Sequence, residues 1–368
     1  YLSIVFMNLI YKYLNILIYI FIYYLFLMKK IVYDIVKTTL PTKLSINKLT
    51  QYSVNSSPQS KLVISRFIKN EIKTRLAHRV VELENLPLGL SNINTIKNVT
   101  GLYIDSFSKL HCFKNIKNHN DSNQFAKLME DIKIAHSNVE YDISIAVRKL
   151  IKENTELKYN YDIDDFLNKF YKSRTGIRIL ISHYLSMYNM ENSIVNKYCN
   201  PISIINQAVD EAYYLCSLNN INAPDIYVYG DTHFNFSYIS CHIYYVTLEL
   251  LKNSIKSTTD TYSKNNCKPI KIFLSKGKEE LIIKISDLGG GFSRDNINKI
   301  FSYGYTTTDI YHSIDNRNSI SGFGHGLPLS RLYCRYFGGD LLIIPFEGVG
   351  TDALIYINRL GDTDETPL

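Results

Sequence analysis

The stretch GFGHGLPLSRLYCRYFGG, Gly322–Gly339, decides how the C-terminal half of this chain folds. Glycine occupies alternate positions at its start, and an apolar stripe with helical spacing follows. Pro328 falls in the first turn of the predicted helix, where its missing N–H costs little, and two glycines end the helix. A glycine-rich turn that leads into a helix N-terminus favours phosphate binding through its geometry and dipole. The G-x-G-x-G spacing is neither a P-loop nor a dinucleotide fingerprint.

A second segment, YYVTLELLKNSIKST at residues 244–258, is predicted to be a helix. Glu249 and Asn253 lie one turn apart and project from one face of it. A carboxylate and an amide in this arrangement suit a hydrated Mg²⁺. An exposed pair on a surface helix would show the same pattern.

A third segment, ISDLGGGF at residues 285–292, joins an apolar strand to a turn. Asp287 at the strand end can accept a hydrogen bond from an exocyclic amine such as N6 of adenine. The glycines at 289–291 let the backbone approach a ligand without interference from Cβ atoms. A simple glycine-rich turn is the alternative interpretation.

Two further features complete the C-terminal pattern. GVGTDALIYI, residues 348–357, is a turn followed by a strand with Thr351 at its start, and Tyr305–Ser321 is a polar segment typical of a mobile lid over a nucleotide. Each motif is weak alone. Their order along the chain resembles the ATP site of the GHKL fold.

The chain divides near residue 195. Apolar residues between 62 and 188 recur at helical spacing, with polar breaks near 86–89, 118–123 and 153–160, which predicts an antiparallel four-helix bundle. Beyond it, strands are predicted at 225–229, 270–274, 281–286, 340–344 and 351–357, with helices on one face of the sheet. The expected fold is α+β: residues 1–60 a targeting or hydrophobic segment, 61–195 the bundle, 196–360 a Bergerat-type ATP-binding sandwich, and 361–368 a tail.

Within the GHKL class, the chain resembles the mitochondrial 2-oxoacid dehydrogenase kinases, which act on pyruvate or branched-chain complexes. ELLKNSIKST, ISDLGGGFSRDNINKIFSYGYTTT and GFGHGLPLSRLYCRYFGGDL carry the resemblance in the C-terminal half. FLNKFYKSRTGIRILISHYL at 166–185 and IAHSNVEYD at 134–142 carry it in the helical half. It covers roughly residues 60–360.

The resemblance implies a protein serine kinase that phosphorylates and inactivates the decarboxylase subunit of such a complex in the mitochondrial matrix. It implies ATP and Mg²⁺, with K⁺ possible, a homodimer, and docking to the lipoyl domain of the complex core. By position, Glu249 would be the general base, Asn253 would ligate Mg²⁺ and Asp287 would bind adenine. The implied ATP contacts are Glu249, Asn253, Lys256, Asp287, Gly289, Gly291, Thr306, Thr307, Gly322, Phe323, Gly324, His325, Gly326, Leu327 and Thr351.

Two positions and one tail motif depart from the family pattern. Tyr245 stands where a histidine commonly pairs with the base, and His242 is one turn further back. Leu288 replaces an arginine. The absence of tryptophan excludes the Asp-Trp tail motif of pyruvate-directed members, which favours a branched-chain-like member. Three other matching residues are expected to be structural: His136, Arg174 and Arg178.

Composition constrains the other classes of function. A net charge of +7 without a basic stripe does not indicate nucleic-acid binding, and six cysteines without a CxxC pair indicate neither a zinc site nor a disulfide framework. Residues 4–27 are apolar enough to span a bilayer, whereas the basic segment from Met28 resembles a transit peptide. A cleaved composite targeting sequence is the third interpretation, and membrane association is expected only if the apolar segment is retained.

Three alternatives remain open from the sequence: a membrane sensor histidine kinase, a non-kinase ATPase of the chaperone, gyrase or mismatch-repair kind, and an ATP-binding scaffold with weak catalysis. The segment around His136 does not look like a phosphoacceptor motif, and the chain has no long region after the ATP fold. The Tyr245 departure keeps the scaffold interpretation open.

Overall fold

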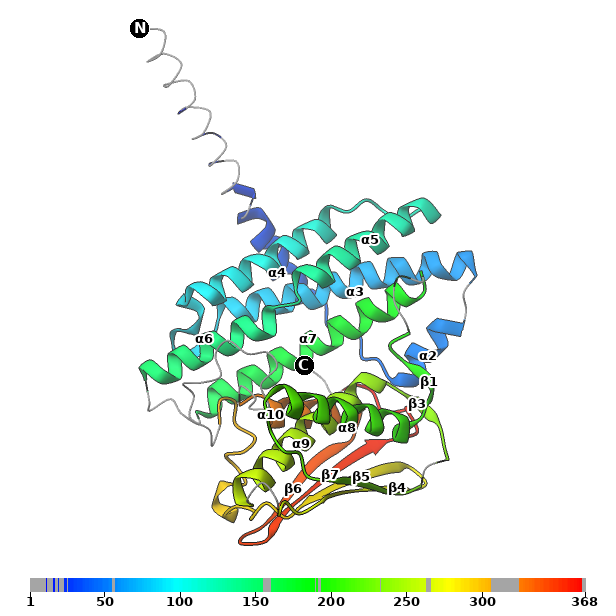
Figure 1. The fold of residues 1–368 in the computed structure, drawn as a ribbon. Helices are drawn as coiled ribbons and strands as arrows, with labels where there is room; N and C mark the ends of the chain where they lie inside the picture. The colour runs from blue at the N-terminus through cyan, green and yellow to red at the C-terminus, as the bar shows by residue number, and fades with distance from the viewer. Residues whose placement is uncertain are drawn as a thin grey trace.

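A computed structural model describes residues 26–368 except 55–56, 155–159, 189, 191–192, 232, 263–265, 306–323 and 366–368; before residue 26 it describes only Tyr11, Ile16, Tyr19, Tyr23 and Tyr24. A helical half is followed by a half built on a sheet (Figure 1). The change falls between Ser186 and Asn196. This arrangement confirms the predicted α+β class.

The helical half contains more helices than the sequence pattern predicted. Its elements are α2 (Ile46–Val54), α3 (Pro58–Glu84), η1 (Pro87–Asn92), α4 (Asn94–Cys112), α5 (His119–Ala135), α6 (Val139–Glu153) and α7 (Tyr161–Ser186). The expected third bundle helix is two helices, α5 and α6, because the chain turns at residues 136–138. Apolar residues continue in helical spacing on both sides of this turn, so the pattern did not reveal it.

Local capping explains where the bundle helices begin. Ser57 accepts a hydrogen bond from the Ser60 amide at the start of α3, and Pro58 occupies the first helical position. Asn118 and Asp121 form a reciprocal capping box at the start of α5. The predicted apolar stripe of α3 is confirmed as core, since Ile68, Ile72, Leu76 and Val80 are all at most 3% exposed.

The second half contains a five-stranded mixed sheet. Its strands are β2 (Ile226–Gly230), β4 (Ile270–Lys276), β5 (Glu280–Asp287), β6 (Asp340–Phe346) and β7 (Gly350–Asn358), in the order β2-β4-β5-β7-β6. Only β2 and β4 pair in parallel. All five strands were predicted, whereas a short antiparallel pair, β1 (Asn196–Cys199) with β3 (Phe236–Tyr238), was not.

Three helices cover one face of this sheet: α8 (Pro201–Leu218), α9 (Ser240–Thr261) and α10 (Gly326–Tyr336) (Figure 1). Buried and exposed residues alternate along β4 because only one face of the sheet is covered. Ile270, Ile272 and Leu274 are buried under the helices. The end of β5 and the start of α10 both contact the middle of α9. The sequence motifs that resemble an ATP site therefore lie at one place.

The N-terminal segment is helical from residue 26 to residue 38 and contacts the end of α3. Tyr33 donates a hydrogen bond to Glu84 over 3.2 Å, and Lys29 pairs with the same carboxylate. The apolar run at residues 4–27 lies mostly outside the described residues. Among the described residues, no helix has the length and apolar character that crossing a bilayer requires.

Two helical glycines should respond oppositely to replacement by alanine. A Cβ at Gly176 in α7 would lie 2.3 Å from Nη1 of the buried Arg75 and 2.5 Å from the Tyr336 hydroxyl, whereas a Cβ at Gly101 in α4 would meet nothing within 4 Å. We expect Gly101→Ala to raise the free energy of unfolding by about 0.5–1 kcal/mol, because alanine restricts the unfolded chain. Gly176→Ala should lower it by about 1–3 kcal/mol through overpacking. Urea unfolding of both variants measures the difference, and equal stabilities would contradict the packing described.

Candidate functional site

A cavity of about 350 Å³ lies between α9, the turn after β5 and the start of α10. Most of the predicted ATP contacts that the structure describes line it: Glu249, Asn253, Lys256, Asp287, Gly289, Gly291, Gly324, Gly326, Leu327 and Thr351. Apolar groups from the sheet and nearby turns complete the wall, including Ile300 and Ile343. Its size and its mixture of apolar walls with a few polar groups suit a nucleotide. Thr306, Thr307, Gly322 and Phe323 lie outside the described residues.

Asp287 lines this cavity at the last position of β5. It is 7% exposed and accepts hydrogen bonds of 2.9 Å from the Ser254 hydroxyl and from the Gly289 amide. Burial raises the pKa of its carboxyl, and these hydrogen bonds oppose that rise only in part. Two donors from opposite sides fix the carboxylate so that its remaining lone pairs can accept from a ligand amine.

The turn after Asp287 requires glycine for steric reasons. A Cβ at Gly289 would lie 2.3 Å from the Ser257 hydroxyl oxygen. Gly291 adopts a left-handed φ of +62°, and a Cβ there would lie 2.4 Å from the Phe346 carbonyl oxygen. The turn is therefore pressed between α9 and the β6–β7 hairpin, which leaves its backbone facing the cavity.

The start of α10 forms the opposite wall. Gly324 has φ +73°, and a Cβ at Gly326 would lie 2.3 Å from Oε2 of Glu249. Amide groups in the first turn of a helix have no partner within the helix and carry partial positive charge. Phosphate binding at this wall is therefore favoured, directly beside the Glu249 carboxylate.

Glu249 pairs with a lysine rather than with a histidine. Lys252 Nζ lies 2.6 Å from Oε1 of Glu249, and both side chains are largely buried. His242 packs on the ring of Tyr333, with ring centroids 4.5 Å apart, and burial lowers its pKa to about 3, so it is neutral. No hydrogen bond between His242 and Glu249 occurs in the part of the chain that the structure describes. Sequence analysis missed Lys252, although its opposite charge at i+3 was a usable signal.

Tyr245, which stands at the usual histidine position, belongs to the same aromatic group. Its ring meets that of Tyr333 edge-on at 5.1 Å, and burial raises the pKa of its hydroxyl well above the usual range. It therefore remains protonated and uncharged at physiological pH. A tyrosine in this state can donate a hydrogen bond but cannot supply the positive charge of an imidazolium.

The side chain of His325 lies outside the cavity, although the sequence analysis placed this residue among the ATP contacts. It is 5% exposed and points into the joint between the halves, where Nδ1 lies 3.3 Å from the Tyr171 hydroxyl. The ring of Tyr303 meets it at 5.2 Å. Burial, followed by the charge of Arg148, lowers its pKa to about 3. Any contact of His325 with a phosphate would therefore come from its backbone.

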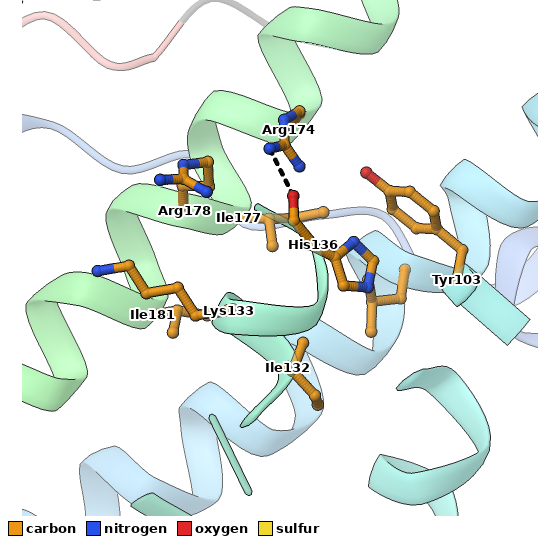
Figure 2. A pocket seen from close by; sticks show the side chains of 9 residues that line it. Tyr103, Ile132, Lys133, His136, Arg174, Ile177, Arg178 and Ile181 are labelled. Atoms are coloured by element: carbon orange, nitrogen blue, oxygen red, sulfur yellow. Dashed lines mark hydrogen bonds between the residues drawn. The ribbon is translucent and has the colours of Figure 1, made fainter. Parts of the chain in front are cut away.

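A second, much smaller cavity lies within the bundle (Figure 2). Its cationic wall comes from Lys133, Arg174 and Arg178, and its volume of about 10 Å³ holds roughly one water molecule. Arg174 donates to the His136 carbonyl over 2.7 Å, and the His136 ring lies 2.9 Å from the Ser106 hydroxyl. Burial lowers the pKa of His136 to about 4. These contacts agree with structural roles for His136 and Arg174.

Comparison with known proteins covers both halves. Residues 43–211 match a family described as mitochondrial branched-chain alpha-ketoacid dehydrogenase kinase. Residues 240–360 match the histidine kinase-, DNA gyrase B-, and HSP90-like ATPase family. The first match covers the bundle and the second covers the cavity, so the two halves occur in the order that the sequence analysis expected.

Relatives extend the similarity over most of the chain. A mitochondrial [pyruvate dehydrogenase (acetyl-transferring)] kinase of Arabidopsis thaliana is 34% identical, over 88% of this chain and 92% of its own length. The corresponding kinase of Schizosaccharomyces pombe is 30% identical, over 88% and 95%, and human isozyme 3 is 31% identical, over 87% and 83%. These relatives place the protein in the mitochondrial matrix. With a GHKL nucleotide cavity joined to the kinase bundle, the chain is an ATP-dependent protein kinase and belongs to the mitochondrial 2-oxoacid dehydrogenase kinase family.

Proposed function

We propose that this protein is a serine kinase that uses MgATP to phosphorylate, and so inactivate, the decarboxylase subunit of a mitochondrial 2-oxoacid dehydrogenase complex. The observation that carries the proposal is the contact between Glu249 and Gly326. It places a carboxylate at the turn that would hold the transferable phosphate. A substrate hydroxyl bound there would lie within reach of both groups.

The described residues fit MgATP. Asp287 would accept the adenine amine, the glycine turn beside it would face the base, and the first turn of α10 would hold phosphates, helped by Lys256. Asn253 supplies an amide oxygen on the Glu249 side of the same cavity, which suits a cation that keeps most of its waters. Bound Mg²⁺ supplies charge neutralisation for the phosphates. Among the described residues, no group of three or more His, Cys, Asp or Glu side chains is placed to hold a metal ion.

Glu249 would take the proton from the substrate serine as its oxygen attacks the γ-phosphorus. The bond from that phosphorus to the β-bridging oxygen breaks, and ADP leaves. In phosphoryl transfer most catalysis comes from positioning and charge neutralisation, so the base needs orientation more than strength. Lys252 fixes the Glu249 carboxylate by the ion pair described above. We infer that this lysine does the orienting that a neighbouring histidine does elsewhere in the family.

Pyruvate dehydrogenase is the substrate complex that we propose first. The Arabidopsis, fission-yeast, fly, nematode, mouse and human relatives are all named for it. These relatives match 87–88% of this chain, and this outweighs the branched-chain preference drawn from the lack of tryptophan. The branched-chain decarboxylase remains the second candidate. Docking to a lipoyl domain and a requirement for K⁺ are proposed from family membership alone.

A homodimer is proposed on the open face of the sheet. Large side chains are exposed there, including Tyr227 at 46%, Tyr229 at 45% and Phe273 at 38%. The rings of Tyr229 and Phe273 stack at 5.3 Å, and Lys284 lies 5.0 Å from the centre of the Phe273 ring. An apolar face that also carries cations and carboxylates can pair with a second copy of itself about a two-fold axis.

Phe273→Glu should convert the protein from dimer to monomer. The new carboxylate would be desolvated in the interface, while a monomer leaves it in water. Sedimentation velocity measures the mass of the full chain. Val63→Glu on the bundle surface, where Val63 is 63% exposed, is the matched control and should leave the mass unchanged. A Phe273→Glu variant that stays dimeric would refute the sheet face as the interface.

Glu249→Gln should abolish transfer and spare nucleotide binding. We expect the rate of serine phosphorylation to fall by about 10²–10⁴-fold, because the amide cannot take the proton. Labelled MgATP is offered with purified pyruvate and branched-chain decarboxylase subunits side by side, and MgADP affinity is measured separately. Asp210→Asn, an exposed carboxylate on α8, is the control.

Three outcomes decide the proposal. Label on a serine of one subunit, lost in Glu249→Gln, supports the kinase and names its substrate. Nucleotide binding without label on either subunit supports the ATP-binding scaffold instead. Undiminished transfer by Glu249→Gln would refute its role as the base.

Nucleotide affinity should fall on acidification. Only the ionised Asp287 carboxylate accepts the adenine amine with all its free lone pairs, and burial raises its pKa above the ordinary 3.8. Affinity should therefore be full at neutral pH and decline as pH falls toward the raised pKa, earlier than for an exposed aspartate. MgADP titrations between pH 8 and pH 5 measure this. Asp287→Asn should bind weakly at every pH, and wild-type-like binding by that variant would contradict the adenine assignment.

A further inference from the structure

The last described residues of the chain return to the bundle. After β7, residues 360–365, here named the C-terminal segment, run beside residues 42–48, the N-terminal strap. The Glu365 amide donates to the Leu44 carbonyl over 2.8 Å, and the Asn47 amide donates to the Gly361 carbonyl over 2.9 Å. An isolated bridge also joins Ser45 to Asp364. The C-terminal segment that follows the sheet is thus joined to the strap that precedes the bundle.

Glu365 is the buried centre of this junction. It is 7% exposed, and its carboxylate accepts hydrogen bonds from both Nη atoms of Arg75, from the Leu44 amide and from the Tyr336 hydroxyl. Arg75 also donates from Nε to Glu71 over 2.7 Å. Burial would lower the pKa of Arg75, but the hydrogen bond and the charge of Glu365 outweigh it, so the guanidinium stays charged.

Tyr336 connects this carboxylate to the nucleotide cavity. It lies at the last position of α10, and the phosphate-facing Gly326 lies at the first. The opposite end of α10 is attached to the bundle at the contact between His325 and Tyr171. An eleven-residue helix transmits displacement of one end to the other as a rigid body, so the two attachments together set where its N-terminal amides point.

We propose that Glu365, held by Arg75 and Tyr336, is a positioning residue for the nucleotide: the C-terminal segment fixes α10 so that its first turn meets the phosphates. The proposal rests on the ATP site proposed above. Under this proposal, residues outside the cavity determine how tightly the cavity binds nucleotide. Neither the C-terminal segment nor the N-terminal strap contributes a described side chain to the cavity wall. Small displacements of binding groups are sufficient to change affinity and rate.

A purely structural role for the junction makes a different prediction. If the attachment of Glu365 strengthens nucleotide binding, then nucleotide must strengthen that attachment by the same factor. If the junction only stabilised the fold, its stability would be the same with and without bound nucleotide. The amides of Leu44, Asn47 and Glu365 are internally hydrogen-bonded, so their hydrogen exchange reports the attachment directly.

Hydrogen exchange of the full chain with and without MgADP, together with MgADP affinity, tests the proposal. We expect MgADP to slow exchange in residues 42–48 and 360–365 of the wild-type protein. Glu365→Gln should weaken MgADP binding about tenfold, within the usual range of coupling, and should remove the slowing. Asp362→Asn is the matched control, because Asp362 is exposed and its described side-chain contact is with Asn358 at the end of β7, not with the strap. It should behave as wild type.

Tyr336→Phe keeps the test decisive if Glu365→Gln does not fold. It removes one hydroxyl and retains the packed ring, so we expect about fivefold weaker MgADP binding in a folded protein. Wild-type affinity and wild-type exchange in Tyr336→Phe, or in folded Glu365→Gln, would overturn the proposal. A wild-type protein that binds no nucleotide at all would instead refute the ATP site, which separates the two failures.

Discussion

The structure depends on the placement of α10 between the sheet and the bundle. Its N-terminus must reach the Glu249 carboxylate, and only glycine at 326 allows that approach. Its side chains pack on α9 and on the sheet. At one end His325 contacts Tyr171 of the bundle, and at the other end Tyr336 donates to Glu365, which Arg75 of the bundle also holds. Because one short helix makes all of these contacts, the nucleotide cavity cannot be separated from the helical half. The two halves are therefore packed together at this joint, although the sequence pattern describes them as two regions.

Sequence patterns were sufficient for features that depend on local chemistry. The five strands could be predicted from alternating apolar residues and from turn residues. Asp287 could be predicted because glycines follow it, and the turn there has left-handed φ angles and leaves no room for a Cβ. Features that depend on a distant partner were missed. The break between α5 and α6 is held by a hydrogen bond from Arg174 in α7. His325 looks like a phosphate contact in the sequence, but its side chain is bonded to Tyr171, which lies 154 positions earlier.

The ion pair between Glu249 and Lys252 bears on the effect of Tyr245, which stands where the family commonly has a histidine. Loss of a histidine beside a catalytic carboxylate would leave that carboxylate without an orienting partner if nothing else changed. Here Lys252, one turn away on the same helix, makes the contact over 2.6 Å. Tyr245 instead fills space against Tyr333. Glu249 therefore keeps a charged partner despite the departure at Tyr245, which supports its proposed role as the base over an inert scaffold.

The C-terminal junction is held by a buried ion pair between Arg75 and Glu365. Desolvation of Arg75 and Glu365 offsets much of their attraction, so a well-packed apolar contact could stabilise the fold as well or better. What an apolar contact could not supply is a single geometry. The guanidinium, the Leu44 amide and the Tyr336 hydroxyl each require the carboxylate in one orientation, and any shift leaves a buried donor unpaired. The junction thus specifies the position of α10 more strongly than it stabilises the protein, and position is what a phosphate-binding helix N-terminus needs.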